Sequence, residues 1–410
     1  MVHILMQLVE RHRINKNSYR GKILDHKLFL SKNLYNSAIY AFRKHYEANK
    51  TYLGYHALEK QFSSTNQPDY RALPAKVSQH VLMQADEAFK SFFKALKSYN
   101  KNPKKFSGPP KIPGFKHKIK GRNMLVFTSQ AISRKDLSPS GIKELPLPTK
   151  ILYKDICQVR IVPGDLYHTV EIIYNKLEKS QADTKNYAAL DPGITNLATV
   201  VTTNSSPLIV PGGPLKSINQ YYNKKRAELQ SQLDKNQKTS KRIKKLTSKR
   251  NDKINDYMHK ASRYIVNHLV SHSVSKLVIG HNKAWKQETN IGKQNNQNFV
   301  SIPHNKFFNM LKYKCSLEGI EVVEREESYT SKCSFLDLET IKKQNSYMGK
   351  RLYRGLFISK DEIKINADVN GSYNILRKEI PDVFNKGIEG VLVRPMRCKP
   401  HKNKLWNKIL

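Results

Sequence analysis

The sequence predicts an α/β protein built from more than one domain. Its 410 residues exceed the roughly 250 at which a single hydrophobic core usually stops growing, so we expect two or three domains. Helical periodicity dominates the first quarter of the chain, whereas strand and helix patterns alternate in the second half. The sequence has no run of about 18 apolar residues that could cross a membrane. Its first apolar stretch is too short, and is followed too closely by charged residues, to be a signal peptide. We therefore expect a cytoplasmic protein without a membrane partner.

The first quarter predicts a strand followed by two helices. Residues 1–26 have the pattern of a strand and a turn. A helical pattern runs from about Lys27 to Lys50, and a stronger one runs from Leu73 to Tyr99 after Pro74. In the second helix apolar residues recur at steps of three and four, and this apolar stripe needs a partner. The earlier helix is the expected partner.

A basic segment, residues 101–122, follows these helices. Its prolines and glycines forbid a helix, and its cations alternate with aromatic rings. Such a segment suits a phosphate backbone and an occasional stacked base, although a solvated linker is the simpler alternative. The candidate nucleic-acid-binding residues are Lys104, Lys105, Phe106, Lys111, Phe115, Lys116, Lys118, Lys120 and Arg122.

Short strands are predicted after the basic segment. Residues 158–174 contain two alternating runs separated by the sequence PGDL, which is typical of a hairpin turn. We expect these strands to form a small β-barrel.

The second half predicts an RNase H-like α/β order. Residues 188–201, AALDPGITNLATVV, indicate a strand, a turn and a second strand. The pattern then continues as strand, helix, strand and helix, with a charged helical hairpin inserted early. These elements are the helical stretch 215–272, the buried parallel-type strand KLVIG at 276–280, the helix 307–318, the strand 320–326 and the helix 365–379.

The net charge points to a polyanionic partner. The chain has 73 Lys and Arg against 33 Asp and Glu, a formal charge of +40. A folded chain with this charge repels itself unless an anion neutralises it, and nucleic acid is the main candidate. A ribosomal-type protein and a protein bound to anionic lipid are the alternatives.

Two aspartates are candidate ligands for Mg²⁺. Asp191 ends the first strand of the second half, and Asp368 begins the last helix. RNase H-like nucleases hold two Mg²⁺ ions with carboxylates from separate elements that meet at one edge of the sheet. An Asp before Pro-Gly is also common in turns, and an Asp near a helix start is a common cap.

Several motifs resemble the TnpB family of transposon-encoded, RNA-guided nucleases, relatives of Fanzor and of type V CRISPR effectors. ALDPGITNLATV is similar to the first RuvC motif of that family and NADVNGSYNI to the third. FFNMLKYKCSLEGIEVV, SYTSKCS and the N-terminal helices with IPGFKHK also match, in the family's order.

The resemblance implies a domain plan and partners. A wedge-like β-barrel domain would comprise residues 1–26 and 105–185, and a helical recognition lobe 27–104. A RuvC-like nuclease domain would comprise 186–410, with the helical insertion 215–272. The family also implies a guide RNA transcribed near the gene and a double-stranded DNA target with a short flanking motif, cut at a prokaryotic nucleoid.

The sequence departs from the family at two points. The central strand usually ends in Glu, but here Gly280 stands in that place. The insertion 329–363 usually holds a four-cysteine zinc ribbon but contains only Cys333, while Cys157, Cys315 and Cys398 lie far away without a CxxC pair. We therefore predict a degenerate ribbon without zinc, and ordinary reduced thiols.

A nearby glutamate is predicted to replace the missing carboxylate. The strand 320–326 should run parallel beside KLVIG, so residues that follow it reach the same edge. Glu327 is separated by two residues from Thr-Ser, a Glu-x-x-Thr-Ser pattern similar to that of the relocated Glu of Fanzor proteins. Glu326 is the alternative because the register of the strand is open. The predicted catalytic and metal-binding set is Asp191, Glu327 and Asp368.

The predicted function is RNA-guided, Mg²⁺-dependent cleavage of DNA. The main alternative is an RNA-guided repressor whose nuclease is inactive because the usual Glu is missing. A transposase that acts without RNA is a weaker alternative, since the sequence offers no recognisable strand-transfer machinery. The oligomeric state and the guide stay open.

Overall fold

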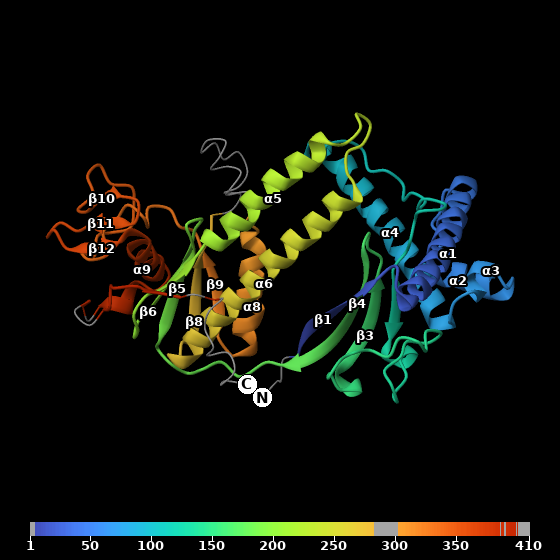
Figure 1. Ribbon diagram of the computed structural model, residues 1–410, viewed down its shortest axis with the longest axis horizontal. Coiled ribbons are helices and arrows are strands. Elements are labelled where there is room, and N and C mark those ends of the chain that lie inside the picture. Colours follow the sequence, from blue (N-terminus) through green and yellow to red (C-terminus); the bar gives the residue numbers. More distant parts are fainter. Residues whose placement is uncertain (1–4, 283–301, 386, 389–390, 399, 401–410) are drawn as a thin grey trace. The chain divides into compact units, whose positions relative to one another are not determined.

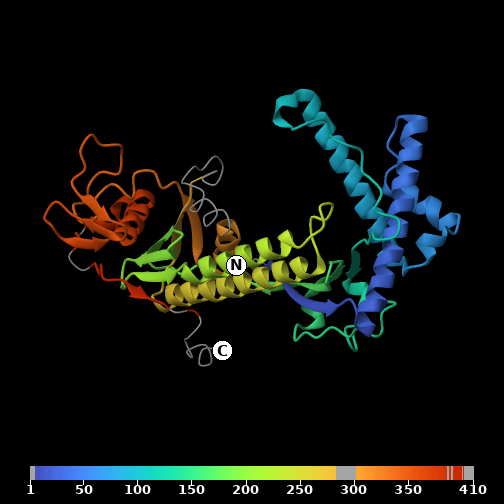
Figure 2. The same cartoon turned by 45° about the horizontal axis from the view of Figure 1, so that its top comes forward.

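We analysed a computed structural model of the chain (Figures 1 and 2). It describes residues 5–282, 302–385, 387–388, 391–398 and 400. The chain divides into two compact units, one containing Ile4–Lys176 and the other Leu177–Leu410. Within the described residues, no helix has the length and apolar character that crossing a membrane requires.

The N-terminal unit combines four helices with a four-stranded sheet (Figure 1). The helices α1 and α4 pack against each other, as the apolar stripe predicted, and Phe42 meets Phe89 with ring centroids 5.2 Å apart. The helices are α1 (Tyr19–Asn49), α2 (Tyr55–Ser64), α3 (Pro68–Arg71) and α4 (Ala75–Lys101), with short 3₁₀ turns at Pro103–Lys105, Ser129–Ala131 and Tyr153–Asp155.

Helix α1 begins earlier than the sequence predicted. The expected start was Lys27, but the helix starts at Tyr19, where the Ser18 side chain accepts a hydrogen bond from the Gly21 N–H at 3.1 Å and caps it. The sequence pattern did not indicate this helix start, because it contains Gly21 and glycine is typical of turns. Here glycine is required because a Cβ at this position would lie 1.9 Å from the Asn15 carbonyl oxygen. The first 26 residues therefore contain a strand and the first two turns of α1 rather than a strand and a turn alone.

The sheet of this unit has the order β1-β4-β3-β2. The hairpin predicted around PGDL is confirmed, because β3 and β4 pair antiparallel across it. The four strands share one core with α1 and α4, built around buried residues such as Phe127 and Ile172. Closure into a split barrel stays a prediction. The strands are β1 (Leu5–Asn15), β2 (Leu125–Thr128), β3 (Ile156–Val162) and β4 (Tyr167–Leu177).

The C-terminal unit contains a mixed six-stranded sheet of order β13-β7-β6-β5-β8-β9. Strands β5, β8 and β9 are parallel neighbours, which confirms the predicted placement of KLVIG beside the strand 320–326. The strands are β5 (Tyr187–Pro192), β6 (Asn196–Thr202), β7 (Leu208–Pro211), β8 (Lys276–Gly280), β9 (Glu321–Arg325) and β13 (Met396–Arg397).

Helices cover both faces of this sheet. On one face α6 (Lys241–Ser271) and α8 (His304–Leu317) pack over Leu190 and Ile279. On the other face α9 (Ala367–Glu379) packs over Ala189 and Val278, together with the 3₁₀ turn Pro381–Phe384. Because successive strand residues face opposite sides, the residues that follow Leu190 and Ile279 face α9.

Two insertions interrupt the sheet. The first is the predicted helical hairpin, formed by α5 (Gly213–Ser231) and α6, which Figure 1 shows as two adjacent antiparallel helices. The second carries a small three-stranded antiparallel sheet of β10 (Lys350–Tyr353), β11 (Leu356–Ile358) and β12 (Lys364–Asn366). Phe357 and Ile365 of this small sheet join the core over α9.

Candidate active site

Asp191 lies near the C-terminal end of β5 and faces α9. Leu190 pairs with Ile279 of β8, so Asp191 and Gly280 are the next residues on the same face. A glycine of α9 leaves room for the carboxylate, because a Cβ at Gly371 would lie 3.1 Å from Asp191 Oδ2. The sheet and α9 together therefore fix the position of this side chain.

Asp368 approaches from the first turn of α9. The Asn366 side chain caps this helix by accepting hydrogen bonds from the N–H groups of Asp368 and Val369. The carboxylate of Asp368 accepts from Asn196 Nδ2 at 2.8 Å and pairs with Arg351 Nη2 at 3.5 Å. Its side chain is therefore held by one residue of β6 and one of β10.

Glu327 occupies the space that a side chain at position 280 would fill. A Cβ built on Gly280 would lie 2.6 Å from Glu327 Oε1 and 2.9 Å from Glu327 Cγ. Glu327 comes two residues after the end of β9, and Arg325 is the register partner of Gly280. The carboxylate thus reaches the end of β8 from the neighbouring parallel strand.

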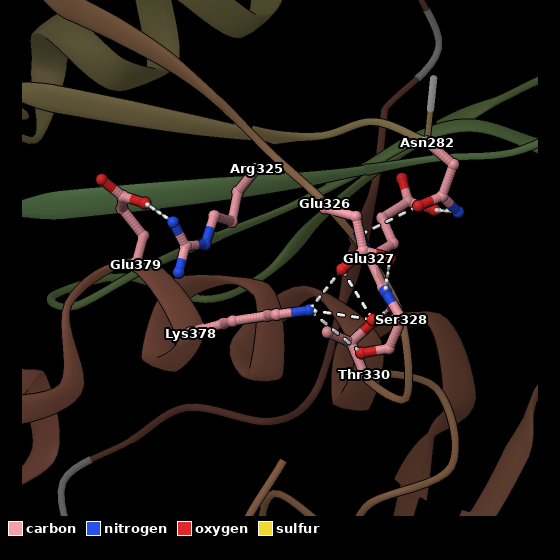
Figure 3. Close-up of polar contacts among 8 residues, drawn as sticks. All are labelled: Asn282, Arg325, Glu326, Glu327, Ser328, Thr330, Lys378 and Glu379. Carbon is pink, nitrogen blue, oxygen red and sulfur yellow. Dashed lines mark hydrogen bonds and ion pairs between the residues drawn. The ribbon is translucent and has the colours of Figure 1, made fainter. Parts of the chain in front are cut away.

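Asn282 holds Glu327 in this position, as Figure 3 shows. The Glu327 N–H donates to Asn282 Oδ1 at 3.1 Å, and Asn282 Nδ2 donates to Glu327 Oε2 at 3.4 Å. The other oxygen, Oε1, is buried and has no hydrogen-bond partner among the described residues. One oxygen is therefore anchored while the other is left for a ligand.

Glu326 has a different environment. Its carboxylate pairs with Lys378 Nζ at 2.7 Å and accepts from the Ser328 hydroxyl at 2.6 Å (Figure 3). These hydrogen bonds lower the pKa of Glu326 to about 2. The side chain is 57 % exposed, and its partner belongs to the C-terminal part of α9. Glu326 thus connects β9 to α9 by a solvent-exposed ion pair.

The carboxylates influence one another's protonation. Burial raises the pKa of Asp191 well above its usual range, and the neighbouring carboxylates of Glu327 and Asp368 raise it further. Burial also raises the pKa of Glu327 to about 7, with a smaller contribution from Glu326. Three acidic groups close enough to repel each other favour a bound cation.

The donor set suits a hard divalent ion. Mg²⁺ prefers carboxylate oxygens, and the unpartnered Glu327 Oε1 beside Asp191 is the kind of atom that such an ion satisfies. Among the residues that the structure describes, however, no three His, Cys, Asp or Glu side chains are close enough to ligate one ion in their present rotamers. Asp368 is engaged with Asn196 and Arg351 instead.

A pocket of about 600 Å³ opens beside the two aspartates. Its lining combines Asp191, Asp368 and the turn between β5 and β6 with Arg351, Tyr353 and Arg354 of the second insertion. A phosphodiester could therefore meet carboxylates and guanidinium groups in one cavity.

The predicted basic segment is only partly a free surface. Arg122 pairs with Asp25 at 2.5 Å, Lys116 lies 4.8 Å from the Tyr35 ring centroid, and Phe115 stacks under Arg43 at 4.8 Å. Phe106 packs against Tyr99. The exposed members are Lys104, Lys105, Lys111, Phe115, Lys118 and Lys120.

Cys333 is buried beneath α9 in the second insertion. Its thiol lies 3.5 Å from the Thr340 carbonyl oxygen, and its own carbonyl oxygen accepts from Asn370 and Asn374 at 2.9 and 2.7 Å. The insertion thus packs through side chains, because the Phe335 ring stacks on the Tyr373 ring of α9 with their centroids 4.3 Å apart.

We expect the insertion to fold without zinc, because a tetrahedral site needs four ligands. Metal analysis of the purified protein should find no stoichiometric zinc. A zinc chelator should change neither the melting temperature of the parent protein nor that of the Cys333→Ser variant. One zinc per chain, or unfolding by the chelator, would contradict this prediction.

Three residues of the site were not predicted from the sequence. Asn196, Asn282 and Arg351 contact the candidate carboxylates, but their partners lie 172, 45 and 17 positions away. Asn370 and Asn374, one helical turn apart, were visible in the third motif, although their role in holding the Cys333 carbonyl was not.

Two family models match the chain. Residues 168–286 match OrfB_IS605, described as a probable transposase, and residues 304–375 match the Cas12f1-like TNB domain. Both matches fall on the segments that carry the RuvC-type motifs. They bear out the resemblance to the TnpB family, because one segment of the chain matches the OrfB_IS605 model and another matches the Cas12f1-like TNB domain. No curated protein matches the chain.

Three solved structures are similar to the chain. A Cas12f1–sgRNA–target DNA complex is 14 % identical, with 86 % of this chain and 82 % of that chain covered and a TM-score of 0.48. The mini RNA-guided endonuclease CRISPR-Cas_phi3 is 11 % identical, with coverages of 91 % and 92 % and a TM-score of 0.45. A CRISPR-Cas12f ternary complex is 15 % identical, with coverages of 86 % and 81 % and a TM-score of 0.38.

Proposed function

We propose that this protein is a TnpB-family, RNA-guided, Mg²⁺-dependent DNA endonuclease encoded by an insertion sequence. The observation that carries the proposal is the position of Glu327. Its carboxylate fills the space beside Gly280 and acts electrostatically on Asp191, as a relocated metal ligand would. A degenerate nuclease has no physical reason to keep a buried carboxylate with an unpartnered oxygen, because such a group costs stability.

The candidate ligands of the metal are Asp191, Glu327 and Asp368. Bound Mg²⁺ would activate a water molecule and stabilise the leaving oxygen of the phosphodiester. Asn282 fixes Glu327 through two hydrogen bonds, one donated to the carboxylate and one accepted from the backbone N–H, and Asn196 orients Asp368. The ion pair with Lys378 keeps Glu326 outside this set.

The proposed partners are a guide RNA transcribed near the gene and a double-stranded DNA target with a short flanking motif. The charge of +40 supports binding to both nucleic acids. The exposed lysines of the basic segment are candidates for backbone contacts. The wedge domain, recognition lobe and nuclease domain stay proposals, and α1 (Tyr19–Asn49) crosses the predicted boundary between residues 26 and 27.

The function is tested by expressing the gene with its native flanking DNA and sequencing the RNA that copurifies. The purified complex should cut a matching DNA target when Mg²⁺ is present, and chelation should stop the cutting. A mismatched target should stay intact. A complex that binds its matched target but never cuts would instead establish the guided repressor, which the loss of Glu at position 280 favours.

A further inference from the structure

Glu339 is a buried carboxylate in the second insertion, between β9 and α9, and is only 4 % exposed. Its Oε2 accepts a hydrogen bond from the Ser334 N–H at 2.7 Å, and its Oε1 accepts one from the Met348 N–H at 3.1 Å. These donors lie five positions before and nine positions after Glu339, on two separate loops. A buried carboxylate is unfavourable unless hydrogen bonds compensate it. Glu339 therefore fits its site only while it joins the two loops.

Arg377 of α9 fastens the same residue to the helix. Its guanidinium donates to the Leu338 carbonyl oxygen at 2.8 Å and to the Glu339 carbonyl oxygen at 3.2 Å. Burial lowers the pKa of Arg377, and the nearby Cys333 and Glu339 side chains counteract this effect. The positive charge thus lies close enough to the buried carboxylate to offset part of the cost of its burial.

The first of the two loops is held along α9 by further hydrogen bonds. Asn370 Oδ1 accepts from the Phe335 N–H at 2.8 Å, and Asn374 Nδ2 donates to the Thr330 carbonyl oxygen at 3.0 Å. Asn370, Asn374 and Arg377 recur at steps of four and three residues, so they share one face of the helix. Helix α9 thus fixes the first loop, and Glu339 connects this fixed loop to the one that precedes β10.

Cys333, the only cysteine of the insertion, does not have the environment of a zinc ligand. Zinc needs four ligands and binds cysteine as the thiolate. The Cys333 thiol instead donates to the carbonyl oxygens of Thr340 and Lys342 at 3.5 and 3.8 Å, and burial raises its pKa. The residues present therefore do not fit a zinc ribbon, and another group has to join the loops.

The loop that Glu339 holds leads directly to the candidate active site. Met348 stands three residues before Arg351 of β10, and Arg351 pairs with Asp368 and lines the pocket beside it. Strand β10 is an edge strand of its small sheet, which Figures 1 and 2 show beside α9. An edge strand has hydrogen bonds to one neighbouring strand, so the position of Arg351 also depends on the loop before β10.

We propose that Glu339, fastened to α9 by Arg377, is a positioning residue that joins the loops of the second insertion where the TnpB family usually has zinc, and so holds Arg351 beside Asp368. The part of the inference that concerns Arg351 in cleavage rests on the proposed function. The two carboxylate oxygens provide a cross-link that needs neither a metal nor a thiol.

Glu339→Gln tests the cross-link in the full protein purified with its guide RNA. The amide keeps the size of the side chain but turns an NH₂ group toward one of the two N–H donors, so one hydrogen bond is lost. Hydrogen exchange measured by mass spectrometry should become at least roughly tenfold faster in residues 346–354 and stay unchanged in the N-terminal unit. The matched control is Glu362→Gln, the same change at an exposed position of the insertion, which should exchange like the parent.

Arg377→Lys is the second variant. It keeps the charge but lacks the planar fork that donates to two carbonyl oxygens, so exchange in residues 346–354 should again become faster. If Glu339→Gln yields no folded protein, this variant decides alone. Exchange that stays at the parent's rate would overturn the proposal, as would one zinc per chain in the parent.

Cleavage of a matched target separates positioning from a general loss of stability. Glu339→Gln should lower the cleavage rate roughly tenfold or more with target affinity unchanged, and Arg351→Gln should lower it at least as much. Because Glu339 acts through Arg351, the double variant should cut no more slowly than Arg351→Gln alone.

Multiplied losses in the double variant would mean that Glu339 does not act through Arg351, and the positioning role would be wrong. A parent that never cuts would reject the proposed function instead. In that case hydrogen exchange still decides whether Glu339 joins the loops, because it requires no cleavage.

Discussion

Replacing Asp191 with alanine is expected to abolish target cleavage while guided DNA binding persists. The proposed Mg²⁺ would contribute several kcal/mol to phosphodiester hydrolysis, so the rate should fall by roughly a thousandfold or more. Binding should survive because Asp191 lies at the end of β5 between the sheet and α9 and holds no positive charge that a backbone needs. Cleavage rate and target affinity are measured on the same purified complex.

The control is Asp361→Ala, which removes an exposed carboxylate from a loop of the same unit. It should cut like the parent. A second readout is independent of cutting. Mg²⁺ should raise the melting temperature of the parent, because it relieves repulsion among the three carboxylates, and should raise that of Asp191→Asn less. Undiminished cutting by the Asp191→Ala protein would refute the assignment.

Without metal, Asp191→Asn should be at least as stable as the parent. Burial and two neighbouring carboxylates raise the pKa of Asp191, so the charged form is disfavoured in the folded protein. The neutral amide avoids this penalty. This measurement distinguishes a functional carboxylate from a structural one, because removal of a structural carboxylate would lower the melting temperature.

The fold of the C-terminal unit was largely predictable from the sequence. Its strands are short apolar runs bounded by turn residues, and strand KLVIG lies between helices long enough to show a clear period. The start of α1 was not predictable in the same way. Gly21 interrupts the helical pattern, and the contact that explains it, with the Asn15 carbonyl oxygen, exists only after β1 and α1 are packed.

The candidate site was predictable where sheet geometry determines it. Parallel strands end on one edge, which was enough to nominate Glu327 from the strand after KLVIG. The choice between Glu327 and Glu326 was not determined by the sequence, because it depends on Lys378 and Asn282 as partners. Nothing in the sequence connects Asn196 or Arg351 to Asp368, since these pairs form only when β6 and β10 meet α9.

Glu327→Gln and Glu326→Gln form a matched pair with opposite expected results. Glu327→Gln should reduce cleavage by roughly a hundredfold or more, since a neutral amide is a poorer ligand of Mg²⁺ than a carboxylate. Glu326→Gln loses an ion pair with Lys378 whose carboxylate is exposed to solvent. Such a pair contributes about 1 kcal/mol or less, so cleavage should stay within a few fold of the parent. Equal rates for both variants would contradict the relocation, and a reversed order would make Glu326 the ligand.

Moving the glutamate back to position 280 tests the relocation directly. Gly280→Glu alone should be inactive or unstable, because its Cβ would lie 2.6 Å from Glu327 Oε1 and 2.7 Å from Ile375 Cδ1. Glu327→Ala alone removes the proposed ligand. The double variant removes the first clash and supplies a carboxylate from β8, and the end of the Ile375 side chain can turn away. Its cleavage should exceed that of either single variant by more than roughly tenfold, a coupling that independent sites do not show. Additive losses in the double variant would mean that the two positions do not share one ligand function.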